Sequence, residues 1–396
     1  MSSVPYDFGT GRSDPATFPT EGLKAAAARV LDREGQSFSG YPGKLGHPGF
    51  RQAMAAREAE REGVAVNPEH LVITNGSMQA VTLTAETLTE PGDAVLLEEY
   101  SYPGTLSAYR SLKLDLVGIP LDEGGMRLDA VEDALTRLQA AGRTAKFIYA
   151  IATYQNPTGF VMPKQRRLEL IRLARRFGVP VIEDNCYGDV HYEGSVEPAM
   201  YALDDGADQI YLCSLSKILA PGFRLGYIHA KPPMLDRILA RRHDAGGNSF
   251  AAAVVAEFYR HGIAGHAAVT NPPLRRKRDL TCRKLAETAA DLCIWSNPAG
   301  GLFIWVRLPD DVDRARLCTL AHSRGLSYLP GTAFHYQGAD VPYLRLAFGH
   351  LTEAQIEEGV PILARCIREA RTSNAAIGFD SLFQSPELQP QKQGET

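Results

Sequence analysis

Short apolar runs alternate with amphipathic segments through the middle of the chain. The runs are rich in β-branched and other apolar residues, as buried strands are, and they occupy 71–74, 94–97, 146–151, 179–182 and 209–213. In the segment 170–177, apolar residues fall at i, i+3, i+4 and i+7, which predicts a helix that Gly178 ends in a left-handed cap. This alternation predicts an α/β fold whose large domain has a mostly parallel sheet flanked by helices on both faces.

The pattern changes near residue 274. A basic segment, 275–278, reads as part of a helix, and two alternating strands follow at 300–306 and 343–348. These elements predict a smaller α+β lobe. We interpret the basic segment as a solvated helix face and not as a nucleic-acid patch, because no aromatic residues are interleaved with it.

The chain of 396 residues is longer than one hydrophobic core usually supports. We therefore expect a large domain at 41–273 and a small domain built from 1–40 and 274–375. Residues 376–396 are expected to form a loose C-terminal tail, because the end of the chain is rich in Gln, Pro, Ser and Glu.

Charge and cysteine usage exclude several classes of partner. The net charge of −4 gives no general attraction to nucleic acid or to an anionic membrane. No apolar run approaches the roughly 18 residues of a membrane span, and the N-terminus lacks the basic and apolar regions of a signal peptide. The six cysteines show no CxxC spacing, so neither a metal site nor a disulfide framework is expected. These features predict a reduced, cytoplasmic protein.

The most informative stretch follows the run 209–213. Ser214 and Ser216 flank Leu215 just before Lys217, and Arg224 comes seven residues after the lysine. An amine beside small hydroxyls and a guanidinium suits a phosphate-bearing aldehyde cofactor, since the amine forms a Schiff base and the other groups hold the phosphate. The alternative is an ordinary surface lysine after a strand.

Other strand ends carry polar or aromatic groups as well. At Gly76 and Ser77 a strand gives way to a helical run, whose free backbone N–H groups bind phosphate or simply form a helix cap. Tyr102 follows another strand end, where it either stacks on a flat heterocycle or packs in the core. Asn156, in a Gln-Asn-Pro-Thr-Gly turn, either donates to a phenolate oxygen or serves the turn.

Two further candidates are charged. Asp184 closes the run 179–182 and is either the partner of a cofactor ring nitrogen or a helix cap, with Tyr187 three residues later as a donor to the ring's phenolic oxygen. Arg345 lies in an otherwise apolar strand and needs a carboxylate partner, from the protein or from a substrate. Carboxyl ends of neighbouring strands gather ligands, so we expect these groups to meet.

These motifs together resemble the class I/II aminotransferase family of fold-type I pyridoxal-phosphate enzymes, nearest to its kynurenine/2-aminoadipate aminotransferase branch. The resemblance spans roughly residues 8 to 370. Its motifs are Tyr41-Pro42-Gly43, Leu45-Gly46, Asn75-Gly76-Ser77, Ser101-Tyr102-Pro103-Gly104, Gln155-Asn156-Pro157-Thr158-Gly159, Glu183-Asp184 with Tyr187, Ser214-Leu215-Ser216-Lys217 with Arg224, Gly300-Gly301, Pro330-Gly331 and Arg345.

The resemblance implies a role for each matching residue. Lys217 is expected to be the Schiff-base lysine and proton shuttle, Asp184 the partner of the pyridine nitrogen, and Tyr102 the residue stacked on the ring. The remaining expected cofactor contacts are to the phosphate, from Gly76, Ser77, Met78, Ser214, Ser216 and Arg224, and to the phenolic oxygen, from Asn156 and Tyr187.

The resemblance also implies how substrates bind. Arg345, with Asn156, is expected to hold the α-carboxylate, and Tyr41 resembles a tyrosine that reaches the phosphate of a neighbouring subunit, which implies a homodimer with shared active sites. Arg12 is a candidate for an acidic substrate side chain, whereas the nearby Asp14 would favour a basic one, and the sequence leaves this choice open.

The implied activity is transfer of the α-amino group of an L-amino acid to a 2-oxo acid, with 2-oxoglutarate as the acceptor by family habit, in a ping-pong mechanism. Elimination, decarboxylation, cyclisation and oxidation are alternatives, because the same cofactor supports them. Met78, where relatives often have glutamine, and the segment 152–154, which lacks a frequent proline, depart from the family pattern and could alter substrate fit.

A transcriptional regulator with this domain would need an added DNA-binding module. Only about 40 residues precede Tyr41, so we expect an enzyme.

Overall fold

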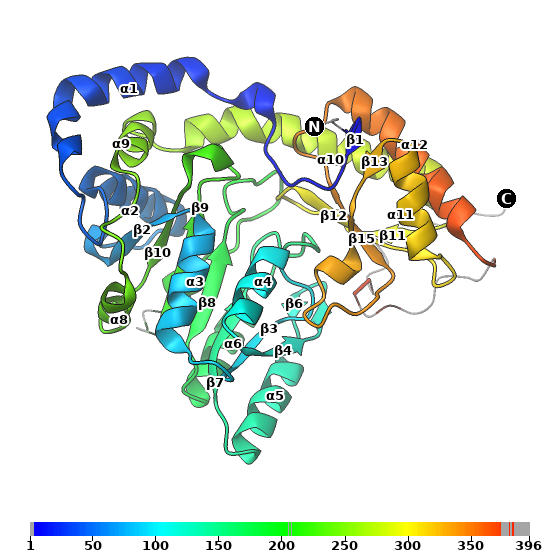
Figure 1. Ribbon diagram of the computed structural model, residues 1–396, viewed down its shortest axis with the longest axis horizontal. Helices are drawn as coiled ribbons and strands as arrows, with labels where there is room; N and C mark the ends of the chain where they lie inside the picture. Colours follow the sequence, from blue (N-terminus) through cyan, green and yellow to red (C-terminus); the bar gives the residue numbers. More distant parts are fainter. Residues whose placement is uncertain (1–3, 205, 207, 374–379, 381, 384–396) are drawn as a thin grey trace.

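A seven-stranded sheet forms the centre of the larger part of the molecule (Figure 1). The computed structural model describes residues 4–204, 206, 208–373, 380, 382 and 383. The strand order is β2-β10-β9-β8-β7-β3-β4, and all pairs are parallel except those that β10 makes with β2 and β9. The strands are β2 (Leu71–Asn75), β3 (Ala94–Glu98), β4 (Asp115–Ile119), β7 (Ala145–Ala150), β8 (Val181–Asn185), β9 (Gln209–Ser214) and β10 (Leu225–His229).

Helices cover both faces of this sheet because its strands are apolar on both sides. Alternate residues such as Val72, Phe147 and Leu212 form one core with helices α3 (Ser77–Leu88), α4 (Pro103–Ser111) and α8 (Met234–Arg241). The residues between them pack on the other face, against α2 (Pro48–Glu62), α5 (Leu128–Ala140), α6 (Lys164–Arg176) and α9 (Ser249–Phe258). The short helix α7 (Met200–Leu203) and the hairpin of β5 (Leu121–Asp122) and β6 (Gly125–Met126) complete this part.

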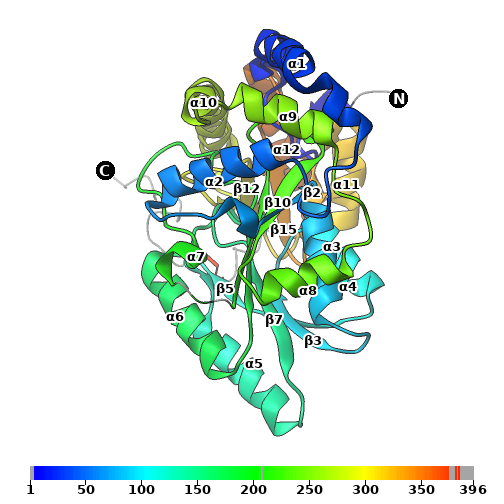
Figure 2. The ribbon, with the colours of Figure 1, turned by 90° about the vertical axis from the view of Figure 1, so that its left-hand side faces the viewer.

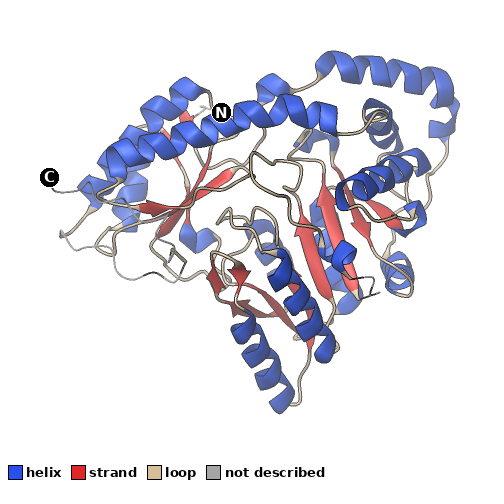
Figure 3. Ribbon diagram, turned by 180° about the vertical axis from the view of Figure 1, so that it is seen from behind, coloured by secondary structure: helices blue, strands red, loops and turns tan. Residues whose placement is uncertain are grey.

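A smaller antiparallel sheet, in the order β11-β12-β15-β14, forms the second lobe. It contains β11 (Ile294–Trp295), β12 (Phe303–Arg307), β14 (Leu329–Pro330) and β15 (Tyr343–Ala347), with helices α11 (Arg314–Ser323) and α12 (Glu353–Ala370). The long helix α10 (Ala264–Ala289) runs between the two parts, as seen from behind in Figure 3.

The N-terminal segment contributes to both parts. Strand β1 (Tyr6–Asp7) pairs in parallel with β13 (Leu326–Ser327) of the small lobe. The chain then passes over the junction, and α1 (Thr20–Glu34) packs on α9, as Figure 2 shows from the side. This path places residues 9–11 against the end of the large sheet, where the candidate site residues gather.

The predicted fold class and the predicted strands are confirmed, with boundaries that differ by a few residues at most. Gly178 has a φ of +68° directly after the last turn of α6, as the cap prediction requires. The interpretation of 275–278 as a solvated face is wrong for half of it. Arg275 and Arg276 are exposed, but Lys277 and Arg278 are buried, because Asp14 and Glu193 give them partners.

The structure describes only a small part of the predicted C-terminal tail. Most of 376–396, the expected tail, lies outside the described residues. Of its described residues, Leu382 and Phe383 pack in the core of the large part, and Asp380 pairs with Arg307 at 2.8 Å. Among the described residues, no helix combines the length and the apolar character that crossing a membrane requires.

Candidate active site

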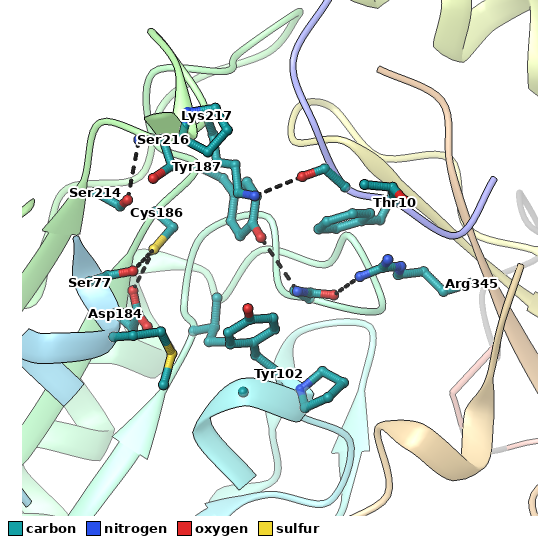
Figure 4. Close-up of a pocket in the computed structure, with 18 of the residues that line it drawn as sticks. Thr10, Ser77, Tyr102, Asp184, Cys186, Tyr187, Ser214, Ser216, Lys217 and Arg345 are labelled. Carbon is teal, nitrogen blue, oxygen red and sulfur yellow. Dashed lines mark hydrogen bonds between the residues drawn. The ribbon is translucent and has the colours of Figure 1, made fainter. Parts of the chain in front are cut away.

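A cavity of about 440 Å³ lies where the carboxyl ends of the large sheet face the small lobe. Its volume is within the range of small-molecule sites. The predicted residues that line it are Ser77, Met78, Tyr102, Asn156, Asp184, Tyr187, Ser214, Ser216, Lys217, Arg224 and Arg345. Residues from distant parts of the chain therefore meet in one cavity (Figure 4), as expected for strand ends of a parallel sheet.

Lys217 follows β9 and extends into the cavity. Its Nζ donates a hydrogen bond to the carbonyl oxygen of Gly11 at 2.8 Å, so the N-terminal segment closes over the amine. Burial lowers the pKa of the Lys217 ammonium, and the positive charges of Arg345 and Arg224 lower it further, against an opposing influence of Cys186. A lowered pKa increases the fraction of neutral amine, which is the form that attacks an aldehyde or accepts a proton.

Asp184 lies at the tip of β8 and is 4% exposed. Its Oδ2 accepts a hydrogen bond from the Tyr149 hydroxyl at 2.6 Å, and its Oδ1 accepts one from the Cys186 thiol at 3.0 Å. Burial raises the pKa of the Asp184 carboxyl, while these two hydrogen bonds lower it. A buried carboxylate on the cavity wall is placed to hold a proton on a ring nitrogen.

The start of helix α3 has the geometry of an anion-binding site. Gly76 caps this helix with a φ of +74°, and the positive end of the helix points toward the cavity wall at Ser77. Arg224 comes close to this turn, donating from Nη2 to the carbonyl oxygen of Asn75 at 3.0 Å. The positive φ favours glycine at residue 76, and a Cβ there would lie 2.5 Å from Arg224 Nη2 and displace the guanidinium. With Ser214 and Ser216 beside it, this corner suits a phosphate.

Arg345 forms the opposite end of the cavity. It comes from β15, is 3% exposed, and donates to Asn156 Oδ1 at 3.0 Å and to the carbonyl oxygen of Gly9 at 2.6 Å. Its Nε is buried and has no hydrogen-bond partner among the described residues. Burial lowers the pKa of the Arg345 guanidinium to about 10, against opposing influences of Tyr187, Tyr102 and Asp7, and among the described residues no carboxylate forms an ion pair with it. An incoming carboxylate would therefore complete the site.

Two tyrosines line the space between these ends. Tyr102 directly precedes α4, and its ring projects into the cavity (Figure 4). A Cβ on residue 104 would lie 2.4 Å from the Tyr102 ring, so Gly104 leaves the room that the ring occupies. The Tyr187 hydroxyl accepts a hydrogen bond from Asn156 Nδ2 at 3.4 Å. The Asn156 amide and the Tyr187 hydroxyl, which are both hydrogen-bond donors, therefore lie side by side.

Three predicted residues do not line the cavity. Gly76 caps helix α3 directly before the lining residue Ser77, whereas Arg12 and Tyr41 have exposed side chains. The Arg12 side chain is 56% exposed, and its nearest carboxylate is Asp7 at 4.0 Å. Tyr41 is 90% exposed within the single chain and borders a separate surface groove with residues 247–250. Asp14, the alternative to Arg12, is paired with Lys277 at 2.7 Å.

Several lining groups were not predicted. Cys186 lies two residues after Asp184, and Thr10, Phe303 and Leu329 come from the N-terminal segment and the small lobe. Cys186 follows the end of the predicted strand that carries Asp184, and this position in the sequence is a signal from which it could have been predicted.

The cavity fits pyridoxal phosphate in charge and in layout. Besides the Lys217 amine, two guanidiniums, Arg224 and Arg345, and one carboxylate, Asp184, line the cavity, which leaves positive charge for a phosphate and a substrate carboxylate. The cavity brings together an amine for an aldehyde, a buried carboxylate for a ring nitrogen and a helix N-terminus for a phosphate. When bound, this cofactor supplies the electron sink that stabilises a carbanion at the substrate Cα.

Beneath the site, Glu98 anchors the segment that carries Asn156. Its Oε1 accepts from the amide of Ile151 at 3.0 Å and its Oε2 accepts from Gln155 Nε2 at 3.3 Å. Burial raises the pKa of the Glu98 carboxyl to about 8, against an ordinary value of 4.5. The folded chain therefore binds one more proton than the unfolded chain between these two pH values.

The stability of the protein should fall as the pH rises through this window, at up to about 1.4 kcal/mol per pH unit from this group. We expect Glu98→Gln to remove that part of the slope, because an amide does not ionise. Urea unfolding of both proteins at about pH 5.5 and about pH 8 measures it, with Glu60→Gln at an exposed site as the control. Equal slopes in the wild type and Glu98→Gln would contradict the assignment.

Comparisons with known proteins agree with this geometry. The family model described as aminotransferase class I and II matches residues 7–363. Aromatic-amino-acid aminotransferase 1 of Thermococcus litoralis is 32% identical and covers 91% of this chain and 87% of its own. The 2-aminoadipate transaminase of Thermus thermophilus is 30% identical and covers 91% and 89%.

A solved structure shows the same fold with the cofactor in place. The kynurenine aminotransferase of Pyrococcus horikoshii, in complex with PMP, superposes with a TM-score of 0.88 at 31% identity, covering 93% of this chain and 92% of that one. Since the family model spans most of the sequence and the site geometry matches the cofactor, the chain belongs to the class I and II aminotransferases and is a pyridoxal-phosphate-dependent transaminase.

Proposed function

We propose that this enzyme transfers the α-amino group of an L-amino acid to 2-oxoglutarate in two half-reactions that use the same cavity in turn. The observation that supports the proposal is that Lys217, Asp184 and Arg345 line one cavity. In this proposal Arg345 binds the α-carboxylate of either substrate, which orients the Cα bond toward the amine. A single carboxylate site serves donor and acceptor alike, as a ping-pong mechanism requires.

Each remaining residue has a role in this scheme. Lys217 accepts the proton from the substrate Cα and returns it to the cofactor side, because its lowered pKa favours the neutral amine. Asp184 holds the proton on the ring nitrogen, while Asn156 and Tyr187 contact the phenolic oxygen. Gly76 and Met78 offer backbone amides to the phosphate, alongside Ser77, Ser214, Ser216 and Arg224.

The lining residues without a cofactor role support a donor with an uncharged side chain. Thr10, Phe303 and Leu329 border the cavity, and none of them carries a charge. The Thermococcus litoralis relative is named for aromatic amino acids. Binding of an acidic donor by Arg12 remains a second proposal, and it requires this exposed side chain to turn toward the cavity.

We also propose that the active form is a homodimer in the cytoplasm. The exposed Tyr41 supports a contact with a neighbouring subunit's phosphate, because a large aromatic side chain that is 90% exposed is left without packing in a monomer. All six cysteines are free thiols, as a reducing compartment would keep them.

The test is a pair of half-reactions with the purified holoenzyme. An amino donor added without acceptor should release no more than one equivalent of its 2-oxo acid per site, and later addition of 2-oxoglutarate should yield glutamate. Phenylalanine should react faster than glutamate or 2-aminoadipate if the uncharged wall selects the donor. Release of ammonia or carbon dioxide in place of transfer would contradict the proposed reaction, and preference for acidic donors would favour the Arg12 proposal.

A further inference from the structure

The Asp184 carboxylate is held from inside the protein on its Oδ2 side. The donor is the hydroxyl of Tyr149, which lies on the neighbouring parallel strand β7, at 2.6 Å. Tyr149 is fully buried, and its hydroxyl is also within 3.1 Å of the Thr105 hydroxyl in helix α4. A buried tyrosine with two polar partners on separate elements has little freedom to rotate away.

The Oδ1 side is held by Cys186. Its thiol lies 3.0 Å from Oδ1 and 3.4 Å from the hydroxyl of Ser77 (Figure 4). The two carboxylate oxygens therefore receive donors from different directions, and the plane of the carboxylate is fixed. An ionised carboxylate has about four acceptor positions, so a ring N–H still finds one free.

The hydrogen bonds from Tyr149 and Cys186 matter because burial opposes ionisation of the Asp184 carboxyl. The carboxyl is 4% exposed and forms no ion pair within the described part of the chain. Its ionisable surroundings are Glu98 on β3, Tyr149 on β7, Tyr102 just before α4, Tyr109 on α4, and Cys186 and Tyr187 after β8, none of which is a cation. A neutral carboxylic acid would not stabilise a protonated ring nitrogen.

We propose that Tyr149, supported by Thr105, and Cys186 are positioning residues that keep Asp184 ionised and directed at the ring nitrogen of the cofactor. This inference rests on the proposed role of Asp184. It goes beyond that role because the proposed function includes neither Tyr149 nor Cys186.

The test compares Tyr149→Phe with Tyr109→Phe. Tyr109 is a matched control, since it is fully buried, its ring contacts the Tyr149 ring at 5.7 Å, and its hydroxyl has no hydrogen-bond partner among the described residues. Each variant removes one buried hydroxyl, but only Tyr149→Phe removes a donor to Asp184. Three readouts are measured: the Kd for pyridoxal phosphate, the pH titration of the visible absorbance of the bound cofactor, and kcat with KM.

We expect Tyr149→Phe to weaken cofactor binding by about tenfold or more, as loss of a hydrogen bond to a charged group does. The pH titration of the bound cofactor should shift, and kcat should fall while KM for the amino donor stays within about twofold, because Arg345 is untouched. Tyr109→Phe should match the wild type in all three. A Tyr149→Phe protein that matches Tyr109→Phe in Kd and titration would overturn the proposal.

A second pair of variants decides the question if Tyr149→Phe does not fold. Cys186→Ser retains a donor beside Oδ1, whereas Cys186→Ala removes it. The proposal requires the serine variant to keep a lower Kd and a titration closer to that of the wild type than the alanine variant. Equal behaviour of the two would overturn it. If the wild type itself binds no pyridoxal phosphate, the proposed cofactor site fails, and that outcome is distinct from failure of the positioning role.

Discussion

Replacing Lys217 with alanine is expected to reduce the transamination rate by at least about 10²–10⁴-fold while leaving the protein folded. This range is what loss of a positioned general base costs, and loss of the covalent attachment adds to it. The phosphate corner around Gly76 and Arg224 does not involve the amine, so the variant should still bind the cofactor. Steady-state kinetics, cofactor absorbance and thermal unfolding measure the three properties.

The control for this variant is Lys24→Ala, which removes an exposed lysine that pairs with Glu21 on the surface of α1. It should leave turnover and absorbance unchanged. A Lys217→Ala enzyme with a rate near that of the wild type would contradict the assignment of the catalytic lysine, whatever the effect of the control.

Replacing Arg345 with alanine has the second large effect that we expect. The guanidinium is 3% exposed and contacts Asn156 and the backbone of Gly9, so its loss removes the cation that meets the α-carboxylate. Truncating one partner of a buried charge pair costs about 2–5 kcal/mol, which corresponds to a fall in kcat/KM of roughly 30-fold to several thousandfold. The fall should appear for the amino acid and for the 2-oxo acid.

A substrate control separates binding from damage to the fold. A primary amine that lacks the carboxylate has nothing for Arg345 to hold, so Arg345→Ala and the wild type should convert it at the same low rate. The cofactor absorbance should also be the same in both. An equal loss of activity toward the amine and the amino acid would show that Arg345 supports the structure and does not bind the substrate.

The sequence predicted most of the site because its residues follow strands. Lys217, Asp184 and Asn156 each come within five residues of the end of an apolar run, and parallel strands bring such positions to one edge. Local patterning was therefore sufficient for these groups. It also placed Gly76, where strand and helix meet at a residue that needs a positive φ.

Other features depend on contacts between distant segments, which a local pattern does not contain. The hydrogen bond from Lys217 to Gly11 joins residues 206 positions apart, so this particular contact does not follow from the local pattern of either segment. The role of Tyr149 depends on the register of β7 beside β8. Likewise, Lys277 is buried only because Asp14 reaches it from the N-terminal segment.

The central claim is that the cofactor is attached to Lys217, and chemical trapping tests it most directly. Borohydride reduces the carbon–nitrogen double bond between a bound aldehyde and a lysine amine to a stable secondary amine. Digestion and mass spectrometry of the reduced holoenzyme then locate the modified residue. The account predicts a phosphopyridoxyl group on the peptide that contains Lys217, and its presence on another lysine instead would contradict it.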